Sequence, residues 1–596
     1  MRKPLSASRV ALLAIGVLCL FGSAAYGQDR DRRDDGRRDE DRRDDVRKDE
    51  HPNGIVQDWS HRHVVYPRFG PVHNLIAIQH DERALSSWQD SWRREWRHGR
   101  NPWHFRRPEP TTHIDWSIPL GAGTTAQDMF PAKFTFDKNA VPNCTTDFVV
   151  FAVNATASGT QPNLVGLNNL YSGTLGGTGI CNRTVTLGVD DGVSATTLFS
   201  YAVKAAGGQV STSPALSLDG TKVAFVESAP ATTAHFHVLA WQSGAGVPTN
   251  LQAPATAPFS VTAFVGIAPV AGTSNATDLV LGATSDTLSS PFIEYNSDMA
   301  YVGSDNGILY RIVNVFCTGV STPCTPGVSS SPGLDASWGS GGGLATGCSG
   351  RLTGAVVDGG TGNIFVGCSD GNLYGFTPAG VALSNSPVAV GDGSATGGIV
   401  DTPLIDVTNE YVYAVSGNSG GGTPTQVVVQ ASTVDLSGKR VATLNAGGLF
   451  NLHAPAFNNA YLSGTGTPLL YEVGAGSGKI TLFGITFGAS DVMTQLTPPN
   501  ATDFTIGAFE ISPLTEFFDG GTEDRLFEST IGAGASLAQF NINTFPGAGQ
   551  NFASEGTGTT GIIVDNAATT TNQADSIYFG ALGSNTAVKL TQSGLQ

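Results

Sequence analysis

From about residue 111 to the C-terminus, short apolar runs alternate with polar turns along the chain. The runs are about four to eight residues long and are separated by Gly, Ser, Thr, Asn and Asp. A strand that buries one face alternates apolar and polar positions, so this spacing predicts β-strands joined by tight turns. We therefore expect an all-β body over residues 111–596.

The strands recur in pairs that share one plan. Ser289–Ile312, Thr353–Phe376 and Val400–Gly420 each contain a small residue or Pro, an apolar strand, a polar turn and a second apolar strand. Positions that this plan makes equivalent are Ala215, Phe292, Val356, Leu404, Ala456, Leu514 and Ile562. They lie 48 to 77 residues apart. Four-stranded propeller blades take roughly 40–50 residues, so the intervals fit blades with insertions in the early ones.

The ends of the repeated region predict how the ring closes. Pro131–Asn154 follows the same plan, which makes the count seven or eight blades, and we favour seven. The last unit is short, so a strand from His113 (HIDWSIPL) is expected to complete it. We predict a single large β-propeller with a short helical or disordered N-terminal extension, because blades packed radially bury both faces of every sheet.

Three stretches carry a resemblance to known families. Ser217–Phe225 (SLDGTKVAF) resembles the core of TolB-type propeller repeats. Tyr301–Ile312 and Ile364–Phe376 resemble the G-x-x-DG-x-LY element of quinoprotein-type propeller repeats. The resemblance implies a propeller, and it implies no activity, because such repeats occur in enzymes, scaffolds and sensors.

The N-terminus predicts export. Residues 1–27 combine a basic start, a short apolar run and a small-x-small site at Ala25–Gly27, which is typical of a secretory signal peptide. The apolar run is shorter than the roughly 20 residues of a membrane span. Residues 28–50 are nearly all charged, so we expect a disordered tether. The mature protein is expected to be secreted or periplasmic, with no transmembrane span once the signal is removed.

Residues 51–110 are rich in Trp, Arg and His and form a separate segment in our reading. A short amphipathic helix near 82–99 would place the candidate ligand-binding residues on one face and its flanks: Trp88, Trp92, Trp96, Arg93 and Arg97. Such a face packs onto the main body or binds an envelope polymer, anionic lipid or glycan, and simple disorder is the third alternative. Its histidines show no spacing typical of a dedicated metal site.

Six cysteines remain after signal removal, and an even number in an exported chain indicates disulfides. We expect sequential pairing among Cys144, Cys181, Cys317, Cys324, Cys348 and Cys368. Sequence alone leaves every other connectivity open. Zinc is the rival interpretation, although no Cys-x-x-Cys motif supports it.

Charge limits the partners. The formal net charge is −17, and residues 111–596 hold 12 basic and 33 acidic residues. Nucleic acid is therefore excluded as the main partner, because phosphate binding needs a basic surface.

Candidate chemistry in the body is sparse. His235 and His237 are two residues apart and so face one side of a strand, where they are candidate metal ligands or bases. Asp305 and Asp370 lie in Asp-Asn-Gly and Asp-Gly turns. They could hold calcium, although turn formation explains them as well. No other cofactor is predicted.

These observations favour an exported propeller that binds or scaffolds at the cell envelope or outside the cell, with no catalytic residues assigned. A glycan, an envelope polymer or a protein is the candidate partner. The alternatives are a polysaccharide lyase or hydrolase and a quinoprotein-like oxidoreductase. Convergent acids and His around the axis would favour an enzyme, whereas Ser, Thr, Gly and apolar residues would favour binding.

Overall fold

The chain divides into two units, Met1–His51 and Pro52–Gln596, and the described structure lies within the second. The computed structural model describes residues 55–67 and 112–592, apart from connecting stretches in the second range. The longest of these stretches are 172–180, 182–194, 257–274, 317–331 and 566–575.

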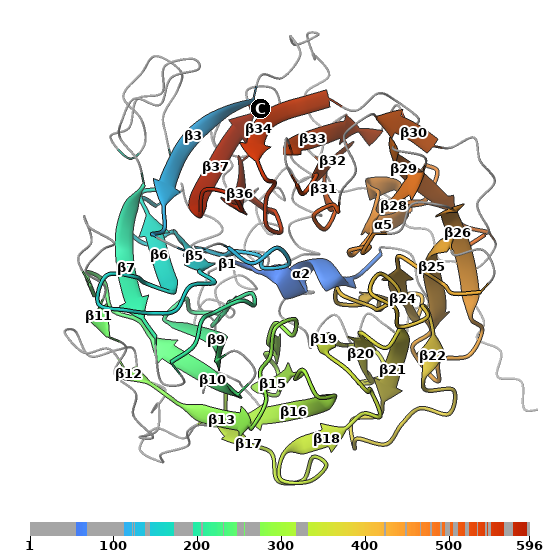
Figure 1. The fold of residues 1–596 in the computed structure, drawn as a ribbon, viewed down its shortest axis with the longest axis horizontal. Helices are drawn as coiled ribbons and strands as arrows, with labels where there is room; N and C mark the ends of the chain where they lie inside the picture. Colours follow the sequence, from blue (N-terminus) through green and yellow to red (C-terminus); the bar gives the residue numbers. More distant parts are fainter. Residues whose placement is uncertain are drawn as a thin grey trace, which may run out of the picture. The chain divides into compact units, whose positions relative to one another are not determined.

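The second unit is an eight-bladed β-propeller, in which eight mainly antiparallel sheets surround a central axis (Figure 1). Blade 1 contains β1 (Ile55–Gln57), β4 (Ala132–Thr135), β5 (Phe148–Ala152), β6 (Leu164–Asn168), β7 (Thr196–Ala202) and β11 (Ala255–Thr256). Blade 2 contains β8 (Ala215–Leu216), β9 (Lys222–Ala229), β10 (Thr233–Ala240), β12 (Asn275–Ala276) and β13 (Leu279–Gly282). Blade 3 contains β14 (Phe292–Glu294), β15 (Met299–Val302), β16 (Ile308–Val313), β17 (Gly333–Leu334) and β18 (Gly343–Ala345). Blade 4 contains β19 (Leu352–Val357), β20 (Ile364–Cys368), β21 (Asn372–Phe376) and β22 (Val388–Ala389).

The second half of the ring follows the same plan. Blade 5 contains β2 (Val64–Val65), β23 (Leu404–Asp406), β24 (Tyr411–Ser416), β25 (Thr425–Ser432) and β26 (Arg440–Ala446). Blade 6 contains β27 (Ala456–Phe457), the helix α5 (Asn459–Ser463), β28 (Leu469–Gly476), β29 (Lys479–Thr486) and β30 (Ala501–Phe504). Blade 7 contains β31 (Thr515–Phe518), β32 (Asp524–Ser529), β33 (Ala535–Asn541) and β34 (Gln550–Gly556). Blade 8 contains β3 (Thr112–Pro119), β35 (Ile563–Asp565), β36 (Ser576–Ala581) and β37 (Thr586–Gln592).

The hydrophobic core lies between neighbouring blades. Phe134 of blade 1 packs in one cluster with Phe225 of blade 2, and Leu470 of blade 6 packs in one cluster with Tyr413 of blade 5. Alternate residues of each strand point to opposite faces, so every central strand contributes to two such layers. This is why most central strands are buried along their whole length.

The repeat assignment is confirmed, and the count is eight. The equivalent positions fall in or beside the innermost strand of blades 2 to 8, from Ala215 in β8 to Ile562 directly before β35. Pro131–Asn154 supplies the innermost pair of blade 1, so the stretch that left the sequence count open is a full blade.

An N-terminal strand closes the ring, as the sequence predicts. β3 pairs antiparallel with β37 over its whole length, with Thr112 opposite Gln592 and Pro119 opposite Thr586. Blade 8 thus takes its outermost strand from the start of the body and three from the end of the chain. Trp116 of β3 is fully buried, and its indole N–H donates to the Leu170 carbonyl oxygen of blade 1 at 3.3 Å.

Two predicted disulfides are confirmed. Cys144 is bonded to Cys181, and Cys348 is bonded to Cys368. Cys317 and Cys324 lie outside the described residues, as do the signal peptide, the charged tether and the expected helix near 82–99. Among the helices that the structure describes, none has the length and apolar character needed to cross a membrane.

Candidate functional site around the propeller axis

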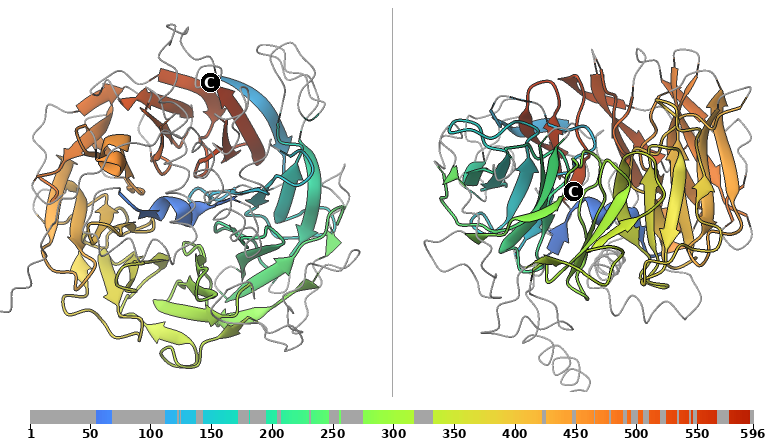
Figure 2. Two further views of the ribbon diagram at one scale, coloured as in Figure 1. Left: turned by 180° about the vertical axis from the view of Figure 1, so that it is seen from behind. Right: turned by 60° about the horizontal axis from the view of Figure 1, so that its bottom comes forward.

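Residues 55–67, here called the axial segment, cross the centre of the ring (Figures 1 and 2). At one end, Ile55 pairs antiparallel with Thr135 on the innermost strand of blade 1. At the other end, Val64 pairs in parallel with Ile405 on the innermost strand of blade 5. Blades 1 and 5 lie opposite each other in a ring of eight. The axial segment therefore adds a short strand to the inner edge of each of these two sheets.

The short helix α2 (Trp59–His63) occupies the middle of the axial segment. Asp58 caps it, because the Oδ1 atom accepts from the backbone N–H groups of Ser60 and His61 at 3.1 and 3.4 Å. The Trp59 indole is 1% exposed and donates to the Pro291 carbonyl oxygen of blade 3 at 3.3 Å. Its ring packs over Gly354 of blade 4, where a Cβ atom would lie 2.8 Å from it. Glycine at this position therefore makes room for Trp59.

Arg62 joins the axial segment to the last two blades. Its guanidinium donates to the Thr515 hydroxyl of blade 7, and to the Ile562 carbonyl oxygen of blade 8 at 3.4 Å. The same group lies 4.9 Å from the centre of the Phe130 ring. Burial lowers the pKa of Arg62 to about 10, which the charges of Asp401 and Glu516 oppose.

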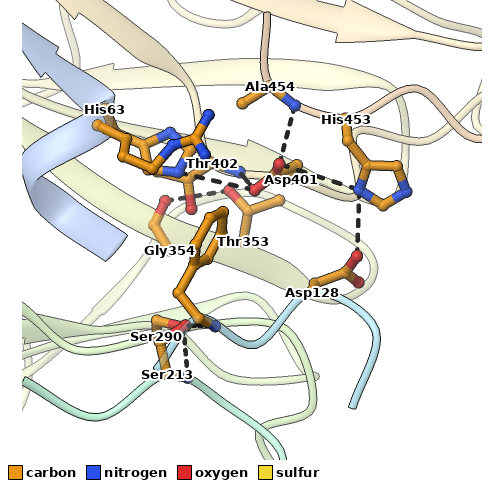
Figure 3. Close-up of polar contacts among 12 residues, drawn as sticks. His63, Asp128, Ser213, Ser290, Thr353, Gly354, Asp401, Thr402, His453 and Ala454 are labelled. Atoms are coloured by element: carbon orange, nitrogen blue, oxygen red, sulfur yellow. Dashed lines mark hydrogen bonds and ion pairs between the residues drawn. The ribbon is translucent and has the colours of Figure 1, made fainter. Parts of the chain in front are cut away.

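A set of charged side chains gathers at the ends of four innermost strands, and Figure 3 shows three of them, Asp128, Asp401 and His453. We call Asp128, Asp401, His453 and Glu510 the axial cluster. Each precedes the innermost strand of its blade, in blades 1, 5, 6 and 7 respectively. Because the innermost strands of a propeller run in one direction, these four positions meet at the same end of the axis.

His453 is the centre of the axial cluster. Its Nδ1 atom lies 3.1 Å from Asp128 Oδ1 and 3.9 Å from Asp401 Oδ2, and its Nε2 atom lies 3.4 Å from Glu510 Oε1. The His453 side chain is 1% exposed, whereas Asp128 and Glu510 are each 27% exposed. A buried imidazole held between carboxylates is stabilised in its charged form.

The pKa values of the two partly exposed carboxyl groups, Asp128 and Glu510, are shifted in opposite directions. Burial alone would lower the pKa of His453, but Asp128, Glu510 and Asp401 raise it well above its usual value. Burial raises the pKa of Asp128, and the His453 charge opposes this. Burial would also raise the pKa of Glu510, but hydrogen bonds and the charge of His453 lower it to about 2. One carboxyl group therefore holds its proton more tightly than usual, and the other holds it less tightly.

Asp401 also accepts a hydrogen bond from a neighbouring blade. In the early blades the residue before the repeat proline donates to the serine at the same position of the following blade: Phe130 N–H donates to Ser213 Oγ, and Ser213 N–H donates to Ser290 Oγ, both at 2.9 Å. In blade 5, Asp401 Oδ2 accepts from Ala454 N–H at 2.8 Å (Figure 3). Asp401 is thus part of the ring of contacts between blades as well as of the axial cluster.

The axis is lined both by convergent acids and His, which we expected of an enzyme, and by Ser, Thr and Gly, which we expected of a binding protein. Ser213, Ser290, Thr353 and Gly354 line blades 2 to 4, whereas acids and His453 converge across blades 1 and 5 to 7. The axial cluster was not predicted from the sequence. A usable signal was present, because Asp401 and His453 each stand two residues before a repeat proline and Asp128 and Glu510 three before one.

Of the site residues predicted from the sequence, the structure describes those in the propeller body but not those near residues 82–99. Trp88, Trp92, Trp96, Arg93 and Arg97 lie outside the described residues. His235 and His237 face the same side of β10, with ring centres 6.1 Å apart.

The two candidate calcium ligands lie in different blades. Asp305 accepts from the Ser285 hydroxyl at 2.8 Å, and Asp370 accepts from the Tyr374 hydroxyl at 2.8 Å and from Asn372 N–H at 3.0 Å. Asp370 therefore bonds within its own turn, whereas Asp305 bonds to a loop that lies 20 residues earlier in the chain.

Taken together, the sheets, their closure and the axial segment define a β-propeller protein. No family model matches the chain, and no curated protein matches it either. Solved propellers do match it. The Saccharomyces cerevisiae Sqt1 structure has a TM-score of 0.44 at 9% identity and covers 81% of this chain and 99% of its own. The Dos1 propeller has a TM-score of 0.42 at 10% identity, covering 80% and 95%. The structure of Chaetomium thermophilum Sqt1 bound to the N-terminus of the ribosomal protein L10 has a TM-score of 0.42 at 11% identity, covering 80% and 97%.

Proposed function

We propose that this protein is an exported β-propeller that binds a partner and catalyses no reaction along its axis. The axial segment carries this proposal. A propeller enzyme needs room for a substrate at its axis, whereas here Trp59, Ser60 and His63 are buried there and Arg62 bonds to two blades. An axis filled by the chain itself leaves the ends of the ring as the surfaces on which a partner binds.

The charge of the protein indicates the kind of partner. The axial cluster places three carboxyl groups around one imidazole, and Asp128 and Glu510 are partly exposed. The body as a whole carries 33 acidic and 12 basic residues in 111–596. An acidic surface raises the association rate of a cationic partner. We therefore propose a basic protein segment as the partner of this end of the propeller.

The test compares two charged peptides. Binding of fluorescent oligolysine and oligoglutamate to the mature chain, from Gln28 onward, is followed by anisotropy at two salt concentrations. Oligolysine should bind, more weakly at the higher salt. Glu510→Gln should weaken it several-fold, whereas Glu410→Gln, which changes an exposed carboxylate of blade 5, should not. Equal binding of both peptides, or no effect of Glu510→Gln, would contradict the proposal.

Hydrolysis of a polysaccharide is the second candidate function, and one observation favours it. The pKa of Asp128 is raised and that of Glu510 is lowered to about 2, which is the pattern of a paired acid and base. Reducing-end release from a panel of polysaccharides tests this directly. Release by the wild type that Glu510→Gln and Asp128→Asn both abolish would establish the enzyme and overturn the binding proposal.

Export is part of the proposal and has its own test. Residues 1–27 have the composition of a signal peptide, and the two disulfides suit an oxidising compartment. N-terminal sequencing of the protein recovered outside the cytoplasm should begin at or near Gln28. A cytoplasmic protein that retains Met1 would contradict export.

A further inference from the structure

The outer edge of blade 2 is interrupted opposite a histidine. β10 pairs on this side with β12 and with β13, with Leu239 opposite Ala276 and Phe236 opposite Leu279. Between these two short strands, Thr277 and Asp278 leave the ladder next to His237. The break turns the Thr277 carbonyl oxygen and the Asp278 carboxylate toward β10.

Four ligand atoms converge at this break. His235 Nδ1 lies 2.6 Å from Asp278 Oδ1, and His237 Nδ1 lies 3.9 Å from the same oxygen. His237 Nδ1 also lies 2.8 Å from the Thr277 carbonyl oxygen. The two imidazoles stand on the same face of the strand because their positions are two apart. Two nitrogen and two oxygen donors thus surround one point at the edge of the blade.

A buried carboxylate orients the inner histidine. Glu227 Oε2 on the neighbouring strand β9 lies 3.1 Å from His237 Nε2, and neither side chain is exposed. Glu227 is itself held, because its Oε1 atom accepts from Gly208 N–H at 2.8 Å. A histidine that binds a metal usually donates its second ring N–H to a carboxylate in this way. With the proton on Nε2, the Nδ1 lone pair points to the carbonyl oxygen and the Asp278 carboxylate, and a cation between them removes the repulsion.

We propose that blade 2 binds one zinc ion through His235 Nδ1, His237 Nδ1 and the Asp278 carboxylate, with the Thr277 carbonyl oxygen close enough to complete the shell. Imidazole nitrogen and carboxylate oxygen are ligands that zinc prefers, whereas calcium takes six to eight oxygens. Asp278 is 29% exposed, so the ion enters from solvent. The ion joins the interrupted outer edge to β10 and stabilises the blade.

The rival arrangement uses the same atoms without a metal. His237 carrying both ring protons would donate to the Thr277 carbonyl oxygen and to Glu227. In that case zinc has no reason to bind here more tightly than at any other histidine. The two arrangements therefore differ in zinc affinity and in the effect of zinc on stability.

The experiment measures zinc binding to the untagged mature chain by competition with a chromophoric chelator, and its melting temperature with and without zinc. Histidines of the N-terminal segment can add background zinc binding, so each variant is compared with the intact chain. His235→Gln and Asp278→Asn should each remove one tight site and abolish the rise in melting temperature. Asp278 is the more exposed of the two, with 29% of its side chain accessible against 11% for His235, so Asp278→Asn is the variant expected to disturb the fold less. Glu227→Gln should weaken the site about 10–100-fold.

His73→Ala is the matched control, because it removes a histidine of the N-terminal segment and should leave the tight site unchanged. Calcium at the same concentration should leave the melting temperature unchanged. Zinc binding that His235→Gln and Asp278→Asn leave unaltered, or no tight site in the intact chain, would overturn the proposal in favour of the metal-free arrangement.

Discussion

Lys133 Nζ lies 3.1 Å from Asp565 Oδ2, and neither side chain is exposed. Lys133 belongs to the innermost strand of blade 1 and Asp565 to the innermost strand of blade 8, so this pair spans the seam at which the ring closes. Lys133 also donates to the Thr135 hydroxyl at 2.6 Å, and Tyr578 donates to Asp565 at 3.2 Å. The seam thus combines a buried ion pair with the strand exchange of β3.

Breaking this pair on one side should destabilise the propeller strongly. Lys133→Met removes the buried cation that lies 3.1 Å from Asp565, which should cost about 3–5 kcal/mol of the free energy of unfolding. Replacing both residues, as Lys133→Met with Asp565→Leu, should recover most of that loss, because the buried carboxylate is removed together with the cation. Urea denaturation followed by tryptophan fluorescence measures both. Lys439→Met, at an exposed lysine of blade 5, should stay within about 0.5 kcal/mol of the wild type. A double variant no more stable than the single one would contradict this account of the seam.

The axial segment should lose stability in acid because of His63. Burial lowers the pKa of His63 to about 4, and Asp401 opposes this. The unfolded chain, with an ordinary pKa of 6.5, binds this proton first. The free energy of unfolding should therefore fall by roughly 3 kcal/mol from this group as the pH drops from about 6.5 to about 4.

His63→Phe should remove that part of the pH dependence, because the aromatic ring keeps its edge contact with Phe130 and carries no proton. Between about pH 6.5 and pH 4, the difference in free energy of unfolding should shift in favour of His63→Phe by roughly 3 kcal/mol. His61→Gln, which changes an exposed histidine of the same helix, should follow the wild type. Parallel curves for His63→Phe and the wild type would show that His63 does not titrate as a buried group.

The buried carboxyl group of Glu528 should make the free energy of unfolding depend on pH in the opposite direction. It is fully buried on β32 of blade 7, at the register position that Val302 and Val366 occupy in blades 3 and 4. Burial raises its pKa to about 8. The folded protein therefore binds this proton more tightly than the unfolded chain, and its stability should fall by roughly 5 kcal/mol as the pH rises from about 4.5 to about 8.

Glu528→Val should stabilise the protein at pH 8, because valine already suits this position in two other blades. The gain over the wild type should shrink as the pH is lowered toward 5, and thermal denaturation at several pH values measures it. Glu410→Gln serves as the exposed control. A Glu528→Val protein that is less stable than the wild type at pH 8 would show that the carboxylate has a partner and a structural role.

The propeller could be predicted from sequence because its units repeat. The same small residue, proline and apolar strand recur at Ala215, Phe292 and the positions equivalent to them, and each copy reports the same local packing. The closure by β3 was predictable for a related reason. The last unit was too short to form a whole sheet, and the strand that begins near His113 precedes the first complete unit, so it was available to pair with the last one.

The axial segment could not be predicted in this way. Residues 55–67 contain one short helix and two strands of two or three residues, and the burial of Trp59 depends on the room that Gly354 leaves at the axis. The axial cluster could not be predicted from the sequence for a similar reason. Asp128 and His453 are far apart in the chain, and only the ring brings them to 3.1 Å.

Hydrogen exchange of the axial segment tests the central claim most directly. In the mature chain at pH 7, the backbone amides of Ile55–Gln57 and Val64–Val65 are expected to exchange as slowly as those of the innermost strands β4 and β23 with which they pair. Exchange of these amides within seconds, while β4 and β23 stay protected, would mean that residues 55–67 do not occupy the axis, and the proposal of a binding protein with a filled axis would fail.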